Sequence, residues 1–241
     1  QLPPVGHGAP LRDLIAAGVP YGELREIRRN SGGIVEACAA IRDGAPWGEG
    51  DNLLVSGCAK PDQQIATMLQ ICRAAKDQGL DPVWDVQIIA AVNQKSPVAR
   101  TTLNKILQAE LNLSAGQSGQ LFRMNDKIVN LENAKFQLID GNQEEDVDDS
   151  DNEPTKNGKP EAFVANGELG RIIELQESFL LVELSSPRRV IRVPRGKSKT
   201  DKQAEPIEGE KTSTGCTFDL GYGLTCHKTK GSSARWVVVM L

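Results

Sequence analysis

The stretch from Val83 to Val92 (VWDVQIIAAV) constrains the fold of this chain more than any other segment. It is rich in β-branched and apolar residues, which is typical of a parallel strand that is buried on both faces. A helix is predicted next, beginning at Ser96–Pro97 and running through Asn112. The apolar residues that share one face of this helix are Leu103, Ile106, Leu107 and Leu111. A strand followed directly by a helix is a βα unit, so the sequence predicts an α/β fold.

Further elements are predicted on both sides of this unit. The spacing of apolar residues predicts helices over Leu11–Ala17, Ile34–Ile41 and Pro61–Gly79. The apolar run Trp236–Leu241 predicts a buried strand that rejoins the α/β core. The segment Tyr21–Arg29 is compatible with either a strand or a turn.

After Leu121 the apolar pattern changes to a period of two. The strands predicted there are Lys127–Leu131, Gly170–Leu175, Phe179–Leu184 and Val190–Val193. Several short strands at this spacing indicate a small β-barrel, inserted into the α/β core. Two loops are expected to lack fixed structure, the acidic loop Asp140–Glu161 and the Lys/Glu/Ser-rich loop Gly196–Thr214.

Charge is distributed unevenly along the chain. The net charge is −4, but seven acids lie in residues 144–153 (EEDVDDSDNE). Without this acidic run, 25 acids remain against 28 bases. The run predicts a solvated loop, and the rest of the chain is mildly basic, which is compatible with a nucleic-acid partner.

The composition also bounds the class of protein. No apolar run approaches the ~18 residues of a membrane-spanning helix, so no membrane contact is expected. The chain begins at Gln1 without a basic-then-apolar leader, and we expect it to be a fragment of a longer protein. Five cysteines without a CxxC pair, and only two histidines, predict reduced thiols in a cytoplasmic protein and no metal site.

Three segments have residue types suited to phosphate chemistry. The opening QLPPVGHGAPLRDL places Gln1 close to two prolines that fix the backbone, although an ordinary loop has the same composition. Residues 23–31 (ELREIRRNS) hold three arginines, which suit either phosphate binding or a solvated basic face. Residues 224–233 (LTCHKTKGSS) offer many donors to a phosphate backbone, while a histidine beside lysines is also common on plain surfaces.

These segments follow the order of motifs in the RecD-like (RecD/TraA type) DNA helicases, the 5′→3′ branch of superfamily 1. The opening resembles motif III, usually Gly-Asp-x-x-Gln-Leu-Pro-Pro-Val-Gly. Residues 24–44 (LREIRRNSGGIVEACAAIRDG) resemble the motif IV region. Residues 84–112 are similar to the family's strand–helix segment, in which Val-Gln is followed by a Leu-Asn-x-x-Leu-Gln helix.

The resemblance continues through the second half of the chain. Residues 122–133 (FRMNDKIVNLEN) and 163–172 (FVANGELGRI) are similar to the edges of the family's SH3-like insertion, called domain 2B. Residues 224–241 (LTCHKTKGSSARWVVVML) resemble motif V, usually Thr-x-His-Lys-Ser-Gln-Gly-Ser-Glu. The match is collinear and covers nearly the whole chain.

This resemblance implies a RecA-like (P-loop NTPase-type) parallel-sheet domain with an inserted small SH3-like β-barrel. The implied parts are residues 1–19 as the end of the first RecA-like domain (1A), 20–119 as the first part of the second (2A), 120–214 as the insertion, and 215–241 as the return to 2A. The implied activity is ATP-driven translocation on single-stranded DNA with unwinding of the duplex, in DNA repair or recombination.

The resemblance also implies roles for individual residues. Gln1 would sense the γ-phosphate of ATP, and Arg29 would reach it from domain 2A and stabilise charge in phosphoryl transfer. The residues implied to contact DNA are Thr225, His227, Lys228, Lys230 and Asn166. The full-length parent would use ATP and Mg²⁺, and would bind single-stranded DNA and the junction with the duplex. The basic stretch Arg188–Lys202 of the insertion would favour phosphates.

The chain departs from the family pattern at three points. Lys230 stands where glutamine is usual, and Ser233 where glutamate is usual. No G-x-x-x-x-G-K-[ST] segment occurs in the 241 residues, so we expect the chain alone not to hydrolyse ATP. Two alternatives follow: a non-enzymatic module that binds single-stranded nucleic acid, and a protein-interaction module that uses the acidic loop or the barrel.

Overall fold

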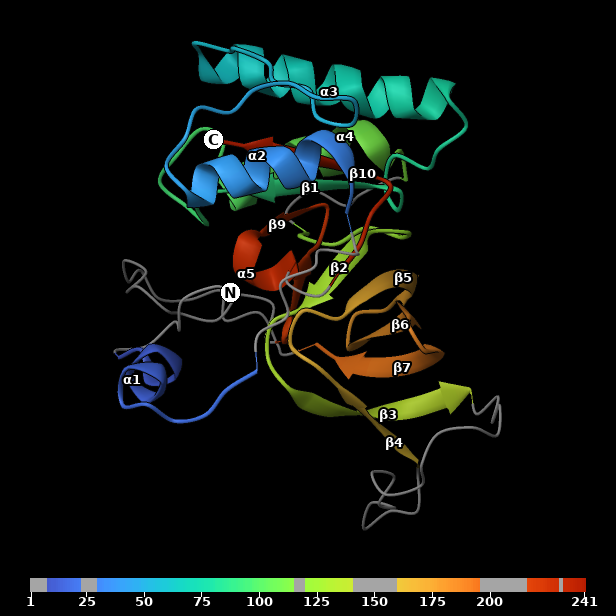
Figure 1. The fold of residues 1–241 in the computed structure, drawn as a ribbon. Helices are drawn as coiled ribbons and strands as arrows, with labels where there is room; N and C mark the ends of the chain where they lie inside the picture. The colour runs from blue at the N-terminus through green and yellow to red at the C-terminus, as the bar shows by residue number, and fades with distance from the viewer. Residues whose placement is uncertain (1–7, 23–29, 115–119, 141–159, 196–215, 230–231) are drawn as a thin grey trace. The chain divides into compact units, whose positions relative to one another are not determined.

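A parallel sheet and an antiparallel sheet organise most of the chain in the computed structural model (Figure 1). The structure describes residues 8–22, 30–114, 120–140, 160–195, 216–229 and 232–241. The chain divides into two compact units, Gln1–Ala59 and Lys60–Leu241.

The first unit contains two helices, α1 (Pro10–Ala16) and α2 (Gly32–Arg42). Both were predicted, and both are confirmed within two residues. Asp51 and Asn52 accept hydrogen bonds from the first free backbone N–H groups of α2, at 2.8 and 3.0 Å. These side chains therefore satisfy donors that a helix start otherwise leaves open. The segment predicted as strand or turn, residues 21–29, lies mostly outside the described residues.

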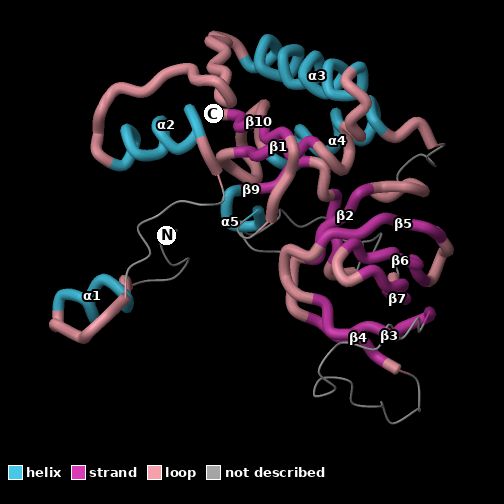
Figure 2. The backbone as a smooth tube through the Cα atoms, turned by 45° about the vertical axis from the view of Figure 1, so that its right-hand side comes forward, coloured by secondary structure: helices cyan, strands magenta, loops and turns pink. Residues whose placement is uncertain are grey.

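The parallel sheet of the second unit has the strand order β10-β1-β9. Its central strand β1 (Val86–Ala90) pairs in parallel with β9 (Gly223–Thr225) and β10 (Trp236–Met240). Helix α3 (Pro61–Asp77) lies above this sheet in Figures 1 and 2, and α4 (Arg100–Leu111) packs against its strand β9. The βα unit predicted from the sequence is confirmed, although β1 covers only the middle of the predicted strand Val83–Val92 and α4 begins at Arg100 instead of Ser96. The fold class is α/β.

The last strand corrects one expectation. The run Trp236–Leu241 was predicted to be buried, but β10 is the edge strand of the described parallel sheet. Val237 and Val239 are 53% and 52% exposed, because only one face of this strand packs on the core. An apolar run alone does not distinguish a central strand from an edge strand.

The antiparallel sheet is inserted between α4 and β9, and its strand order is β4-β3-β7-β6-β5-β2-β8. The strands are β2 (Lys127–Asn130), β3 (Ala134–Asp140), β4 (Glu161–Val164), β5 (Leu169–Leu175), β6 (Phe179–Ser185), β7 (Arg188–Pro194) and β8 (Phe218–Leu220). The sheet curls strongly, since the rings of Phe136 and Phe218, near opposite ends of the strand order, have centroids 5.6 Å apart. The four predicted strands are confirmed, and β3, β4 and β8 were not predicted.

The loops of this sheet fall mainly outside the structural description. Residues 141–159 and 196–215, which cover most of the two loops expected to lack fixed structure, are not described. Glu161, placed at the end of the first loop from the sequence, instead begins β4. The chain then crosses from β8 to β9 within three residues, so residues 218–220 pair with the antiparallel sheet and residues 223–225 with the parallel one.

Candidate nucleic-acid interface

Four of the seven candidate residues lie in described parts of the structure. Thr225 ends β9, His227 and Lys228 lie on the following short helix α5 (Cys226–Thr229), and Asn166 lies in the turn between β4 and β5. Gln1, Arg29 and Lys230 lie outside the described residues, so their roles stay predictions.

Thr225 is positioned by the register of the parallel sheet. It lies beside Ala90, the last residue of the central strand β1, so α5 begins at the carboxyl edge of the sheet. Thr225 is buried, whereas the next residues, Cys226 and His227, are exposed. Thr229 Oγ1 donates to the carbonyl oxygens of Thr225 and Cys226 at 3.3 and 3.1 Å, which stabilises the single turn.

Lys228 joins α5 to the antiparallel sheet. Its Nζ donates to the backbone oxygen of Leu131 at 3.2 Å and to Oδ1 of Asn166. A Cβ atom built on Gly167 would lie 3.4 Å from the backbone oxygen of Lys228, so the turn after β4 packs directly against α5. The structure thus brings together two segments that are 62 positions apart in the sequence.

The turn that carries Asn166 is fixed by a buried asparagine. Asn130 Nδ2 donates to the carbonyl oxygens of Val164 and Ala165 at 3.1 and 3.2 Å, and the Asn130 carbonyl oxygen accepts from Gly167 N at 2.8 Å. Gly167 has φ +93°, a conformation that residues with a side chain rarely adopt. The turn is therefore specified by Asn130 and Gly167 and presents Asn166 at its surface.

The Lys228 contact orients the amide of Asn166. Because Oδ1 accepts from Lys228, the Nδ2 group is left as a donor that has no partner among the described residues. Burial, followed by the positive charge of Arg100, holds the pKa of Lys228 below its usual range, against a smaller opposing effect of Glu132. Arg100 itself is paired with Asp219 at 2.8 Å.

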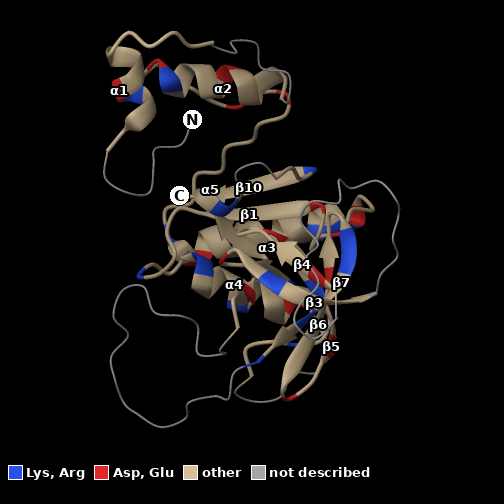
Figure 3. Cartoon of the chain, turned by 90° about the horizontal axis from the view of Figure 1, so that it is seen from below, with Lys and Arg blue, Asp and Glu red and all other residues tan. Residues whose placement is uncertain are grey.

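The chemistry available at this surface is that of hydrogen-bond donation and positive charge. Basic residues mark α5 and β7 in Figure 3. The described residues contain no group of three His, Cys, Asp or Glu side chains that could hold a metal ion. Within the same ranges, no helix is long and apolar enough to cross a membrane. The surface, which we call the α5 surface (Thr225, His227, Lys228 and Asn166), suits a polar or anionic chain.

Comparisons with known proteins do not assign the chain to a family. No protein-family model and no curated protein matches it. Among solved structures, it is similar to the Pif1 helicase from Bacteroides in complex with ADP-AlF3 and single-stranded DNA, with 15% identity and a TM-score of 0.43 over 90% of this chain and 44% of that one. For Bacteroides Pif1 bound to single-stranded DNA, the identity is 15% and the TM-score 0.43, over 99% of this chain and 53% of that one. The chain spans about half the length of these structures.

Sequence reasoning noted the Leu-Asn-x-x-Leu-Gln pattern but assigned no role to its polar residues, which hold this surface in place. Asn104 of α4 is buried, and it donates to the carbonyl oxygens of Leu220 and Gly223 and accepts from Gly223 N. It therefore fixes the crossing between the two sheets just before Thr225. The available signal was the position of Asn104 and Gln108 directly beside the apolar face of Leu103 and Leu107, where a solvent-facing helix side is not expected.

Proposed function

We propose that this chain is part of an ATP-dependent DNA helicase of the RecD-like superfamily 1 type, and that its α5 surface binds the backbone of single-stranded DNA. The contact between Lys228 and Asn166 supports this proposal most directly. Two segments that the family resemblance assigns to DNA contact, motif V and the edge of the insertion, meet at this contact. Backbone contacts of this kind position a strand without reading its sequence.

In this proposal the antiparallel sheet is the SH3-like insertion, and the parallel sheet belongs to the second RecA-like domain. The ATP and Mg²⁺ of the full-length parent would be bound with Gln1 and Arg29, which the resemblance places at the γ-phosphate. The insertion would hold the strand near the junction with the duplex. Movement between the domains would then be coupled to the strand through α5, since α5 follows the parallel strand β9 directly.

Removing one charge from the α5 surface tests the proposal. We expect Lys228→Gln to weaken binding of the full chain to a dT20 oligonucleotide, because glutamine keeps a donor toward Leu131 but loses the charge. The slope of log affinity against log salt should become shallower by about 0.7, the value for one phosphate on a single strand. Fluorescence anisotropy over a salt series measures both quantities.

Lys105→Gln is the matched control, because Lys105 is an exposed lysine on α4 and the charge change is the same. Its affinity and salt slope should equal those of the unmodified chain. Equal slopes for Lys228→Gln and the unmodified chain would contradict DNA contact at Lys228. Absence of dT20 binding by a folded chain would leave the protein-interaction module as the better hypothesis.

The non-enzymatic binding module remains the second candidate, favoured by Lys230 and Ser233 at positions where motif V usually has glutamine and glutamate. It predicts the same DNA binding as the helicase fragment. Single-stranded DNA should then stimulate no ATPase activity in the longest natural form of the protein, and this measurement separates the two.

A further inference from the structure

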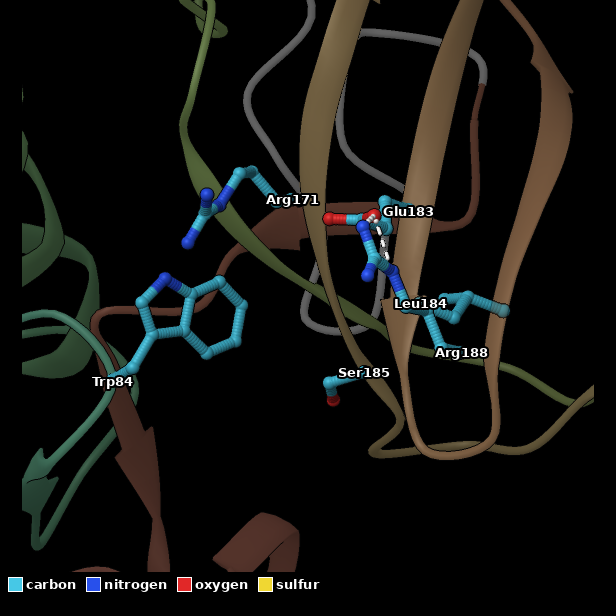
Figure 4. Close-up of a pocket in the computed structure, with 6 residues that line it drawn as sticks. All are labelled: Trp84, Arg171, Glu183, Leu184, Ser185 and Arg188. Atoms are coloured by element: carbon cyan, nitrogen blue, oxygen red, sulfur yellow. Dashed lines mark hydrogen bonds and ion pairs between the residues drawn. The ribbon is translucent and has the colours of Figure 1, made fainter.

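A small hollow lies between the segment that precedes β1 and the outer face of the antiparallel sheet. Its volume is about 140 Å³. The residues that line it are Trp84, Arg171, Glu183, Leu184, Ser185 and Arg188. Figure 4 shows the Arg171 guanidinium close to the Trp84 indole, with the paired side chains of Glu183 and Arg188 across the hollow from them. None of these residues belongs to the α5 surface.

Arg171 is the uncompensated charge of this hollow. Arg171 on β5 lies directly opposite Glu183 on β6 in the strand register. The Glu183 carboxylate nevertheless forms its ion pair with the guanidinium of Arg188, at 2.7 Å. Among the described residues, the Arg171 guanidinium has no hydrogen-bond or ion-pair partner. Its central carbon lies 5.3 Å from the centroid of the Trp84 ring, so a cation–π contact orients it. The five N–H donors of this guanidinium are therefore held at the hollow without an acceptor in the part of the chain that the structure describes.

A buried lysine also contacts Trp84, from the same face of the antiparallel sheet as Arg171, because Lys127 and Arg171 lie directly opposite each other on β2 and β5. Lys127 Nζ lies 5.2 Å from the Trp84 ring centroid, and it donates to the Val83 carbonyl oxygen at 2.7 Å and to Gln87 Oε1 at 3.3 Å. The indole is thus fixed between β2 and the start of β1. An aromatic side chain beside positive charge is the combination that binds single-stranded nucleic acid, through bases or sugars and through phosphates.

The hollow and the α5 surface lie toward opposite ends of the parallel sheet. Thr225 is in register with Ala90 at the carboxyl end of β1, whereas Trp84 precedes the first residue of β1. At ~3.3 Å per residue, the four steps of β1 from Val86 to Ala90 alone extend about 13 Å. The hollow is therefore a separate site and not an extension of the α5 surface.

We propose that this hollow is a second contact for single-stranded nucleic acid, in which Arg171 binds one phosphate group and Trp84 packs against the adjoining nucleotide. The proposal rests on the proposed function, because it takes the same ligand. Arg171 is already oriented by Trp84, so binding a phosphate there costs little further side-chain conformational entropy. The ion pair of Glu183 and Arg188 contributes no net charge, so Arg171 is the lining residue assigned to the phosphate.

Replacing the open guanidinium tests the site. We expect Arg171→Gln in the full chain to weaken dT20 binding about three- to tenfold and to lower the salt slope by about 0.7. Arg73→Gln is the matched control, since Arg73 is an exposed arginine on α3 that is paired with Glu110. The control should leave affinity and slope unchanged. An unchanged slope in Arg171→Gln, with dT20 still bound, overturns the second contact and leaves the α5 surface intact.

Tryptophan fluorescence tests the site without altering it. Trp47→Phe and Trp236→Phe together leave Trp84 as the single reporter. We expect dT20 to change Trp84 emission at the concentration at which it binds, and Arg171→Gln to remove that change. Constant emission during dT20 binding overturns the proposal. An equal change with sodium phosphate at the same phosphate concentration also overturns it, because the site then takes free anions. If dT20 does not bind at all, both the proposed function and this inference fail.

Discussion

The pKa of Lys127 shows how strongly the folded environment can change the properties of a single side chain. Its side chain is 2% exposed, although lysine is almost never fully buried. Its Nζ group donates hydrogen bonds to two uncharged acceptors, the Val83 carbonyl oxygen and Gln87 Oε1, and it lies close to the Trp84 ring. Burial therefore dominates and lowers the pKa of Lys127 to about 8, against a smaller opposing effect of Asp81.

This shift predicts a specific dependence of stability on pH. Between pH 8 and about 10.4 the unfolded chain keeps the Lys127 proton that the folded chain has lost, so stability rises with pH across this window. Lys127→Met lacks this contribution. We expect the free energy of unfolding of the unmodified chain, relative to Lys127→Met, to increase by about 1–2 kcal/mol from pH 7.5 to pH 9.5. Urea unfolding at the two pH values measures it, and Lys105→Met provides the exposed control. Parallel pH curves for the two chains would show that Lys127 does not titrate in this range.

The residues of the candidate site differ in how far the sequence predicts them. Thr225, His227 and Lys228 occur together in one short segment, so their pattern is visible without a structure. The partnership of Lys228 with Asn166 is not visible, because it arises only when the inserted sheet returns to α5. Arg171 alternates with buried neighbours and has the pattern of an ordinary surface residue, so its orientation over Trp84 depends wholly on tertiary structure.

At the scale of elements, α4 connects the two sheets through buried polar side chains. Asn104 binds the crossing from β8 to β9. Gln108 and Asn112 donate to the buried carboxylate of Asp126 at 2.6 and 2.7 Å, and Tyr222 donates to it at 2.9 Å. Every one of these partners is uncharged, so the Asp126 carboxylate depends on correctly placed donors.

Asn104→Leu tests this connection. Leucine has a similar size but leaves the Gly223 N–H group without its acceptor and removes a donor from the carbonyl groups of Leu220 and Gly223. The Leu220 carbonyl oxygen keeps only a 3.5 Å contact from Arg100. A buried polar group left without a partner costs about 1–3 kcal/mol. We expect a loss of at least about 3 kcal/mol and a fall in the melting temperature of about 6–12 °C. Thermal unfolding followed by circular dichroism measures it. Lys105→Leu, an exposed substitution on the same helix, should change stability by less than about 0.5 kcal/mol. A similar melting temperature for both variants would mean that water replaces the hydrogen bonds of Asn104 to the backbone groups of Leu220 and Gly223.

The helices and strands differ in how well the local sequence pattern predicts them. The helices and β1 were predictable because each has a clear apolar period. Strand β3 was missed although Phe136 and Leu138 alternate with polar residues, because its flanking segments, including the acidic run, indicate loop. Strand β3 forms because it pairs with β4 and β7, which lie far away in the sequence. Long-range pairing of this kind is not encoded in any short window.

For the whole molecule, the second unit has a hydrophobic core that comes from its own sequence. The buried members of this core begin at Met68 and end at Met240, and they include residues of α3, both sheets and α4. A unit with its own core is expected to fold alone.

Residues 60–241 expressed alone test this expectation. We expect this fragment to unfold cooperatively, with a melting temperature within about 3 °C of the corresponding transition in the full chain, since about 1 kcal/mol corresponds to 2–4 °C at this size. Residues 80–241 provide the control, because this shorter fragment lacks Met68, Cys72 and Ala75, which are at most 1% exposed. It should lose the cooperative transition. If residues 60–241 also lost it, the core of the second unit would require Gln1–Ala59, and DNA-binding experiments would then have to keep both units together.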